Sequence, residues 1–301
     1  MSLLARAEKS LEQCFDAAVG HAAPPRLVAA MRHAVFSGGA RIRPQLAMAV
    51  AISCGDDLPG LTNAAASAIE IMHCASLVHD DMPAFDDADM RRGRPTVHKE
   101  FGEPLALLTG DALIVMAYQV LLNAGHAYPS RLVALMQNMS AGVGLPSGIV
   151  AGQAWECEVK ADLGQYQRAK TGALFVASTC AGALASNGDA EPWIALGANL
   201  GEAYQVADDI RDVVGQSAEL GKPCGQDALH ARPSVATELG LGGAIDYFQS
   251  LMEAAVASVP ACTCRDMLQQ LVRREAERLV PSAACAAYRQ QSARAALAAQ
   301  V

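Results

Sequence analysis

The segment His73–His98, HCASLVHDDMPAFDDADMRRGRPTVH, contains the pattern that decides how the chain is interpreted. It follows an apolar, alanine-rich run with helical spacing, and it places five aspartates directly before three arginines: Asp80, Asp81, Asp86, Asp87 and Asp89, then Arg91, Arg92 and Arg94. Mg²⁺ is typically bound by a few carboxylates together with substrate phosphates, and the planar guanidinium of arginine suits phosphate oxygens. The segment therefore predicts a site that binds a polyanion together with a divalent metal.

The composition favours helices. The 301 residues are 52% hydrophobic and only 5% aromatic, and the sequence is rich in alanine and leucine, which are strong helix formers. We find no strand pattern longer than a few residues, no short-period repeat and no low-complexity linker. We therefore predict one all-α domain that spans residues 1–301, and we expect Asn63 to cap the long helix that carries Asp80 and Asp81.

Charge and sequence patterning indicate the cellular compartment of the protein and exclude some classes of partner. The formal net charge of −8 argues against general nucleic-acid binding. No uninterrupted apolar run of about 18 residues is found, which predicts no membrane span, and charges at Arg6, Glu8 and Lys9 come too early for a signal peptide. The nine cysteines include no C-x-x-C pair. Together these features predict a protein of the reducing cytoplasm.

A second acidic cluster lies in the predicted helix Pro192–Val214. Four polar residues have the spacing i, i+3, i+4, i+7 that places them along one helix face: Gln205, Asp208, Asp209 and Asp212. Like charges at this spacing destabilise an isolated helix by about 0.2–0.5 kcal/mol, so the cluster does not serve stability. An exposed acidic stripe is one interpretation. Two aspartate-rich helix faces in one chain favour a second metal site, and Lys222 and Arg232 follow in a predicted loop that could close over an anion.

Two other segments carry charged groups. The turn at residues 37–44, SGGARIRP, brings Arg43 to the start of a predicted helix, and taken alone it is better explained as a solvated helix start. Lys170-Thr171-Gly172 interrupts the predicted helix Gln165–Ser186. Because a glycine inside a helix costs up to about 1 kcal/mol, we predict a kink there.

From about Phe36 to Pro233 the chain resembles the trans-prenyltransferases, the isoprenyl (polyprenyl) diphosphate synthases. Asp80, Asp81 and Asp86, followed by Arg91-Arg92-Gly93, are similar to the first aspartate-rich motif of that family in its bacterial form with a four-residue spacer. Asp208, Asp209 and Asp212 are similar to the second, and the GGARIRP turn, Lys170-Thr171 and Gly221-Lys222 also match. The resemblance implies an orthogonal α-helical bundle with a deep central cavity, two acidic motifs facing each other at its mouth, and a homodimer.

The reaction implied by the resemblance is head-to-tail condensation of isopentenyl diphosphate with an allylic diphosphate. Mg²⁺, with Mn²⁺ as a possible substitute, would neutralise the leaving diphosphate. Its ligands would be Asp80, Asp81, Asp86, Asp208 and Asp212, while the allylic diphosphate would also contact Arg91, Lys170, Lys222 and Arg232. The Thr171 hydroxyl and the Gln205 side-chain oxygen would face the developing carbocation. The departing diphosphate would serve as the base.

Isopentenyl diphosphate needs no metal in this scheme, and the resemblance assigns it to three cationic groups: Arg43, His73 and Arg92. Ala40 stands where many members carry a lysine. This difference predicts weaker binding of isopentenyl diphosphate, or compensation by Arg41. Glu156 stands where aspartate is commoner in the family, and we expect Gln153, in the same segment, to lie near the site.

Product length in this family is set by bulk beneath the first motif. Ala75 lies five residues before Asp80, about 7.5 Å down the helix. Ala75 and Ser76 are both small, whereas farnesyl-forming relatives tend to carry an aromatic here. This predicts a C20 product, geranylgeranyl diphosphate, with C15 farnesyl diphosphate as the alternative, and Met72, Met116 or Tyr118 as the cavity floor. The resemblance is greatest to the geranylgeranyl diphosphate synthases of carotenoid- and chlorophyll-making bacteria.

Two other functions share part of the pattern. A class I terpene cyclase has the first acidic motif and the all-α fold, but it usually carries an Asn/Ser/Glu-type second metal site. A non-catalytic subunit that tunes an active synthase would be expected to lack aspartates in one motif, and none is missing here. Consumption of isopentenyl diphosphate separates these functions from a synthase.

Overall fold

The fold is built almost entirely of helices. The computed structural model describes residues 1–20, 22–158, 163–214 and 235–281. The first helices are α1 (Leu3–Val19), α2 (Pro25–Val35), α3 (Ile42–Ser53), α4 (Pro59–Asp80), α5 (Val97–Phe101), α6 (Glu103–Gly125) and α7 (Pro129–Val143). They are followed by α8 (Ile149–Trp155), α9 (Leu163–Gln167), the π-helix η1 (Arg168–Gly172), α10 (Ala173–Ala185), the 3₁₀-helix η2 (Glu191–Trp193), α11 (Ile194–Val214), α14 (Val235–Ser258) and α15 (Arg265–Leu279). The predicted all-α class is confirmed.

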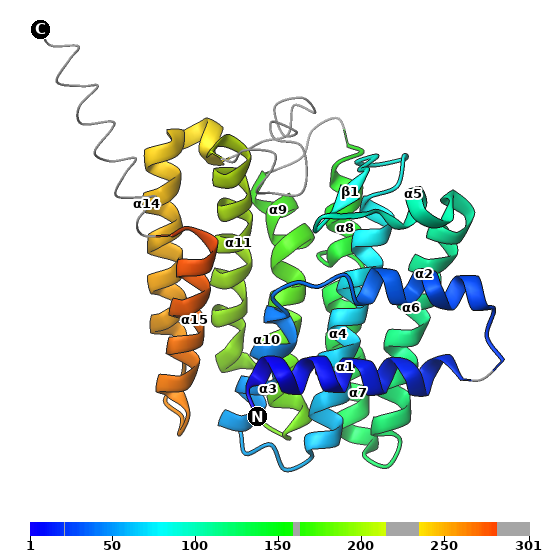
Figure 1. The fold of residues 1–301 in the computed structure, drawn as a ribbon. Helices are drawn as coiled ribbons and strands as arrows, with labels where there is room; N and C mark the ends of the chain where they lie inside the picture. Colours follow the sequence, from blue (N-terminus) through cyan, green and yellow to red (C-terminus); the bar gives the residue numbers. More distant parts are fainter. Residues whose placement is uncertain (21, 159–162, 215–234, 282–301) are drawn as a thin grey trace, which may run out of the picture.

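One small antiparallel hairpin interrupts the helices. Strands β1 (Met90–Arg91) and β2 (Arg94–Pro95) contain two residues each, and Arg91 pairs with Arg94. Arg92 and Gly93 form the turn, with φ of 53° and 73°. The hairpin lies above the C-terminal end of α4, next to α5 (Figure 1). It therefore holds the predicted arginines over the end of the helix that carries the aspartates.

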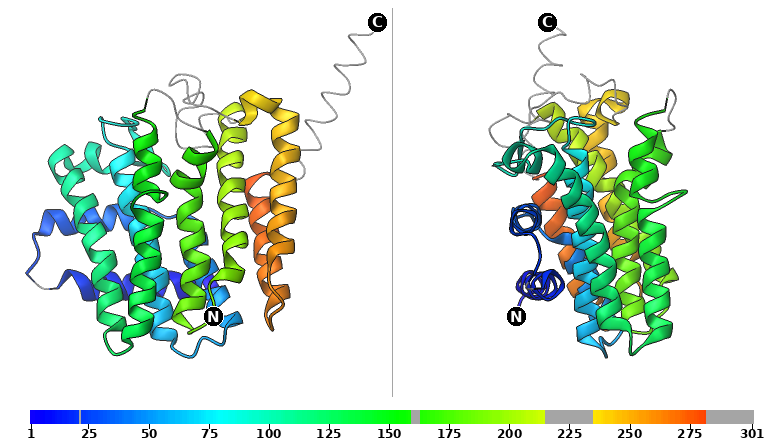
Figure 2. Two further views of the ribbon diagram at one scale, coloured as in Figure 1. Left: turned by 180° about the vertical axis from the view of Figure 1, so that it is seen from behind. Right: turned by 90° about the vertical axis from the view of Figure 1, so that its right-hand side faces the viewer.

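The helices lie in two directions. The long helices α4, α6, α7, α10, α11 and α14 stand side by side, and α1 and α2 run across them on one face (Figure 1). A view turned by 90° shows α1 and α2 end-on while the long helices stay upright (Figure 2). This crossing agrees with the orthogonal bundle implied by the resemblance. The deep central cavity stays a prediction.

Two clusters of buried apolar side chains hold the bundle. One joins α1, α4, α6 and α7 through side chains that include Phe15, Ile69, Leu113 and Leu135. The other joins α3, α10, α11, α14 and α15 and includes Leu46, Phe175, Leu200, Phe248 and Leu268. Helix α10 belongs to both, because Leu174 is part of the first cluster and Phe175 of the second. Since η1 leads directly into α10, its polar residues are fixed where the two clusters meet.

The start of α4 differs from the prediction. The helix begins at Pro59 after Leu58, four residues before the predicted cap at Asn63. Proline is favoured in the first turn of a helix because its missing N–H has no intrahelical partner there. The Asn63 side chain accepts a hydrogen bond from Arg6 Nε at 2.8 Å and so ties α1 to α4. The expected cap at Asn63 is therefore wrong.

The predicted kink at Lys170-Thr171-Gly172 takes the form of the π-helix η1. Single π-helical turns inside α-helices often occur at functional sites. The close approach of α11 depends on glycine, since a Cβ on Gly201 would lie 2.4 Å from the Cα of Gly172. The turn that carries Lys170 and Thr171 is thereby held against the helix that carries the second acidic motif.

Two of the described helices, α4 and α6, are long and apolar enough to cross a membrane, as judged by length and composition alone. The most apolar window of α4 is 78% buried inside the protein, which is typical of a core helix, whereas that of α6 is 44% buried. Helix α6 therefore exposes an unusual amount of apolar surface.

Candidate active site

The first aspartate motif lies at the C-terminal end of α4. Asp80 ends the helix and Asp81 follows as its C-cap. Arg91 donates from Nε to both carboxylate oxygens of Asp81, each at 2.8 Å, and its Nη2 lies 2.7 Å from Asp81 Oδ1. Burial raises the pKa of Asp81, and the Arg91 guanidinium counteracts this. The Asp86 backbone N–H donates to the carbonyl of Asp80 at 3.0 Å, which folds the loop back over the helix end.

Lys170 connects this motif to α8. Its Nζ lies 3.2 Å from Asp80 Oδ1 and 2.5 Å from Oε1 of Glu156, the residue that caps α8. Two other groups donate to the same carboxylate: the Tyr166 hydroxyl at 2.6 Å and Gln153 Nε2 at 3.3 Å. Gln153 is near the site as expected. Glu156 therefore acts on Lys170, a role that the sequence did not reveal.

The ammonium of Lys170 lies between two carboxylates because α8 packs closely on η1. A Cβ on Gly152 would lie 2.2 Å from the Lys170 backbone nitrogen, so only glycine allows this approach. Tyr166 was missed in the sequence. Its position four residues before Lys170 would place both on one helix face, and this spacing could have identified it.

Thr171 connects η1 to the second motif on α11. Its hydroxyl donates to Gln205 Oε1 at 2.8 Å. The Thr171 oxygen keeps its lone pairs because it is the donor, so it can still face a developing cation. Consecutive residues thus contact the two helices that carry the motifs, since Lys170 reaches Asp80 on α4 and Thr171 reaches Gln205 on α11.

The adjacent aspartates of the second motif have different environments. Asp208 is half exposed and lies 3.1 Å from Arg211 Nη1. Asp209 is buried, accepts from Gln205 Nε2 at 3.0 Å, and also accepts from the Val235 backbone N–H at 2.8 Å. Asp209 therefore fixes the start of α14, and Asp208 is the carboxylate left to face a ligand. Asp209 lies beside Gln205, as the i, i+4 spacing predicts, but its carboxylate is bound within the protein.

Three cationic groups assigned to isopentenyl diphosphate gather near the GGARIRP turn. The pKa of His73 lies well below its usual value, first because of burial and then because of Arg43, Arg92 and Arg91. The Arg43 guanidinium carbon lies 4.4 Å from the centre of the Phe175 ring. Arg92 Nη1 donates to the carbonyl of Gly38. In the described part of the chain, neither Arg43 nor Arg92 forms an ion pair with a carboxylate.

Arg41 has no capacity to replace the lysine missing at Ala40. Its guanidinium is 3% exposed and donates to Glu8 Oε1 at 2.8 Å, to Glu70 Oε1 at 2.8 Å and to the carbonyl of Val35 at 2.7 Å. These bonds direct it away from the neighbouring cations and tie α1 and α4 to the turn. Compensation by Arg41 is therefore wrong, and weaker binding of isopentenyl diphosphate remains the prediction.

The residues assigned to product length lie on α4 beneath Asp80. Ala75 is buried, and the Ser76 hydroxyl donates to the carbonyl of His73 at 2.8 Å. Met72 and Met116 are buried in the same apolar cluster, with Tyr118 packed against it. Three other predicted site groups, the side chain of Asp212, Lys222 and Arg232, lie outside the described residues.

The carboxylates suit a divalent metal that arrives with phosphate. Asp80 and Asp86 lie close enough to Asp81 for their charges to raise its pKa. Among the described residues, no group of three or more acidic, histidine or cysteine side chains could hold a metal ion by itself. Mg²⁺ usually keeps several waters and shares one or two carboxylates with substrate phosphates, so an incomplete set of oxygen ligands fits it.

A family model agrees with this geometry. The model described as "Polyprenyl synthetase" matches residues 24–258. The chain belongs to the polyprenyl synthetase family. The predicted family is thus confirmed, and the match includes every described site residue and both acidic motifs.

Individual members are also similar to this chain. The geranylgeranyl diphosphate synthase of Cereibacter sphaeroides is 51% identical over 91% of this chain and 97% of its own length. That of Rhodobacter capsulatus is 46% identical over 93% and 97%. A crystal structure of a geranyltransferase from Helicobacter pylori, complexed with magnesium and isoprenyl diphosphate, is 30% identical with a TM-score of 0.74. It covers 91% of this chain and 96% of that one.

Proposed function

We propose that this polyprenyl synthetase condenses isopentenyl diphosphate with an allylic diphosphate in a Mg²⁺-dependent head-to-tail reaction, and that its main product is geranylgeranyl diphosphate. The observation that carries the proposal is the pair Lys170 and Thr171: Lys170 contacts Asp80 of the first acidic motif, and Thr171 contacts Gln205, three residues before the second. The names of the relatives and the magnesium complex of the Helicobacter pylori enzyme support it.

The allylic diphosphate lies, in this proposal, between the two acidic motifs. Bound Mg²⁺ would be held by Asp80, Asp81, Asp86, Asp208 and Asp212, and would supply Lewis-acid neutralisation of the leaving group. Arg91 and Lys170 would turn from their carboxylate partners to phosphate oxygens, joined by Lys222 and Arg232. The Thr171 oxygen and the Gln205 amide oxygen would stabilise the positive charge left on the allylic carbon. The released diphosphate would accept the proton from the new intermediate.

Isopentenyl diphosphate would bind to Arg43, His73 and Arg92 without metal. The arginines around His73 support this assignment: burial is the main cause of its depressed pKa, and Arg43, Arg92 and Arg91 add to it, so the region is positive and would favour an anion. Close to neutral pH the imidazole is uncharged and can donate one hydrogen bond to a phosphate oxygen.

Product sizing tests the reaction directly. The purified protein is incubated with Mg²⁺, labelled isopentenyl diphosphate and a C5, C10 or C15 allylic primer, with EDTA as the control. We expect metal-dependent consumption of isopentenyl diphosphate and a main C20 product. A C15 end product would favour the farnesyl alternative, and cyclised product without consumption of isopentenyl diphosphate would contradict the proposal.

Product length is tested at Ala75. Ala75 and Ser76 leave the face of α4 beneath Asp80 without bulk, so Ala75→Phe should place a ring in the path of the growing tail and shift the main product from C20 to C15. Ala66→Ser, a small substitution elsewhere in the buried part of α4, serves as the control. An unchanged product distribution in Ala75→Phe would remove Ala75 from the set of length-determining residues.

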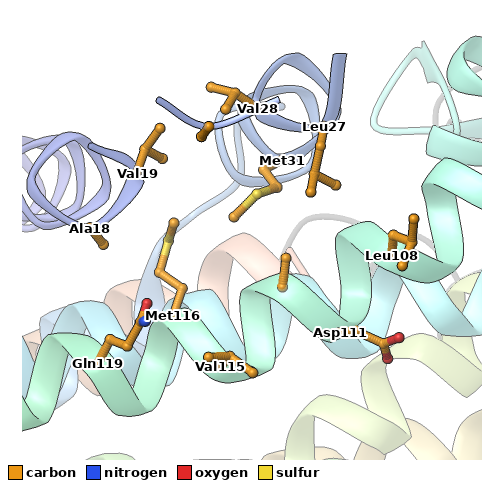
Figure 3. Close-up of a pocket in the computed structure, with 12 residues that line it drawn as sticks. Ala18, Val19, Leu27, Val28, Met31, Leu108, Asp111, Val115, Met116 and Gln119 are labelled. Carbon is orange, nitrogen blue, oxygen red and sulfur yellow. The ribbon is translucent and has the colours of Figure 1, made fainter. Parts of the chain in front are cut away.

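We also propose that the protein is a homodimer formed through α6. Four large apolar side chains of α6 are about half exposed: Leu107, Leu108, Val115 and Leu122. Between α6 and the pair α1 and α2 lies a groove of about 400 Å³, where Met31 and Leu27 point toward Met116 and Leu108 (Figure 3). A second copy would cover this surface, which explains why so apolar a helix is incompletely buried.

Sedimentation velocity should give a dimer for the wild type and a monomer for Leu108→Glu/Val115→Glu, and a monomeric wild type would refute the assignment. A cytoplasmic location remains a prediction.

A further inference from the structure

Arg43 is supported by an aromatic ring. Its guanidinium carbon lies 4.4 Å from the centroid of Phe175 on α10, inside the range of a cation–π contact. The Nε of Arg43 is buried and has no hydrogen-bond partner among the described residues. The Phe175 ring, and not a hydrogen bond from Nε, therefore holds this guanidinium, and the orientation of the ring determines the position of the Arg43 charge.

The Phe175 ring is in turn fixed by Tyr204. Phe175 is fully buried, and its centroid lies 4.6 Å from that of Tyr204, with 45° between the ring planes. Tyr204 directly precedes Gln205 on α11, so the pair connects α10 to the helix of the second acidic motif. Close aromatic pairs prefer particular geometries, which limits how either ring can turn.

Tyr204 is anchored to the C-terminal helix α15. Its hydroxyl donates to Glu275 Oε1, and Arg278 donates from Nε to the same oxygen at 2.9 Å and from Nη2 to the Tyr204 hydroxyl at 3.0 Å. Arg211 binds the end of α15 as well, because its Nη2 donates to the carbonyl of Leu279 at 3.1 Å. In Figure 1, α15 stands beside α14 and α11. A continuous series of contacts thus runs from α15 to the Arg43 guanidinium.

We propose that Phe175, Tyr204 and Glu275 are positioning residues that hold Arg43 in place, so that α15 sets the affinity of the enzyme for isopentenyl diphosphate. The proposal rests on the proposed function, which assigns Arg43 to the diphosphate of that substrate. None of the three residues needs to touch the substrate. Disturbing the series should raise KM for isopentenyl diphosphate and leave KM for the allylic diphosphate, whose groups lie on α4, η1 and α11, nearly unchanged.

The test is a double-mutant cycle between Phe175 and Arg43, with steady-state kinetics in both substrates. Phe175→Leu should raise KM for isopentenyl diphosphate about tenfold, a value between those of an exposed and a desolvated cation–π contact, and change KM for the allylic substrate less than twofold. In the Arg43→Gln background the same substitution should have no further effect on KM for isopentenyl diphosphate, because its effect acts through Arg43. Independent, multiplying effects of the two substitutions would overturn the proposal.

Milder variants keep the test valid if Phe175→Leu is unstable. Tyr204→Phe and Glu275→Gln should each raise KM for isopentenyl diphosphate about threefold, the loss expected for one weakened hydrogen bond. Tyr247→Phe is the matched control. Like Tyr204, Tyr247 donates its hydroxyl to a glutamate of another helix, in this case from α14 to Glu202 on α11, but it takes no part in the series of contacts. If Tyr247→Phe raises this KM as much as Tyr204→Phe does, the effect is general to the bundle and the proposal is wrong.

Failure of the two proposals can be told apart. If Arg43→Gln itself leaves KM for isopentenyl diphosphate unchanged, the assignment of Arg43 in the proposed function is wrong. If Arg43→Gln raises this KM at least tenfold while Phe175→Leu and Tyr204→Phe leave it unchanged, the substrate assignment holds and only the positioning role is refuted.

Discussion

The two regions proposed to bind diphosphates differ in how their charges are balanced. At the end of α4, Arg91 pairs with Asp81, and Lys170 lies between Asp80 and Glu156. Near the GGARIRP turn, Arg43 rests on an aromatic ring and Arg92 donates to a carbonyl, and burial together with the neighbouring arginines depresses the pKa of His73. The first region is neutralised from within, and the second retains unbalanced positive charge.

This difference teaches how one protein can tell two diphosphates apart. An anion entering the balanced region must be accompanied by positive charge, because otherwise it competes with Asp80, Asp81 and Glu156 for the same cations. A divalent metal brings that charge. The unbalanced region attracts an anion without metal. The four predictions below test this contrast, from the largest expected effect to the smallest.

Removal of one metal-binding charge should have the largest effect. Asp81→Asn deletes a carboxylate of the first motif and should reduce kcat about 10²–10³-fold, which corresponds to about 2.7–4 kcal/mol in the barrier. KM for isopentenyl diphosphate should change less than threefold, because this substrate is proposed to bind without metal. The control is Asp16→Asn, an exposed carboxylate that pairs with Arg32. Turnover at the wild-type rate in Asp81→Asn would contradict a catalytic role for this motif.

Glu156→Gln should have an intermediate effect. Loss of its charge leaves Lys170 paired with Asp80 alone, which should hold Asp80 away from metal and lower kcat/KM for the allylic substrate about tenfold. Glu156→Asp, which keeps the charge, should recover part of the loss, and Glu191→Gln in the exposed η2 turn should have no effect. Initial rates with varied allylic substrate provide the measurement. If Glu156→Gln and wild type have equal kcat/KM, Lys170 is positioned without Glu156.

A cation added to the unbalanced region should have a smaller effect. Ala40→Lys restores the lysine that many family members carry and should lower KM for isopentenyl diphosphate about threefold, since an additional charge near a phosphate contributes about 1 kcal/mol or less at a partly exposed position. Ala40→Gln, similar in length but uncharged, should not lower it. An unchanged KM in Ala40→Lys would mean that Arg43, His73 and Arg92 already saturate the diphosphate.

The smallest expected effect is a pH dependence of stability. The folded-state pKa of His73 is depressed below its value of about 6.5 in an unfolded chain. Below pH 6.5 the unfolded chain therefore binds a proton that the folded protein does not, and the free energy of unfolding falls by up to about 1.4 kcal/mol per pH unit. Urea unfolding at pH 7.5 and 5.5 measures how much the free energy of unfolding falls between these two values. This decrease should be smaller for His73→Gln than for the wild type. Equal losses would mean that His73 titrates normally.

Much of the fold and the site could be predicted from local pattern. Helical periodicity and the helix-favouring composition indicated the all-α class and the long helix that carries Asp80 and Asp81. The glycine after Lys170-Thr171 indicated an irregular turn, which is η1. These predictions succeeded because each depends on residues close together in the sequence.

The errors arise where tertiary contacts decide. The i, i+4 spacing correctly places Asp209 beside Gln205, but it cannot show that the backbone N–H of Val235 binds the same carboxylate. Arg41 is two residues from Arg43, yet Glu8 and Glu70 turn it the other way. Val235 is far from Asp209 in the sequence, and Glu8 and Glu70 are far from Arg41. The local pattern therefore could not predict these contacts. Glu156 was noticed as a difference from the family, but its partner Lys170 became evident only through the packing of α8 on η1.

Equilibrium binding with and without metal tests the central contrast most directly. Isothermal titration calorimetry with isopentenyl diphosphate, and separately with an unreactive thiolo analogue of the allylic diphosphate, would be done in Mg²⁺ and in EDTA. We predict that EDTA weakens binding of the allylic analogue at least tenfold and changes binding of isopentenyl diphosphate less than twofold. Equal metal dependence of the two ligands would contradict the account.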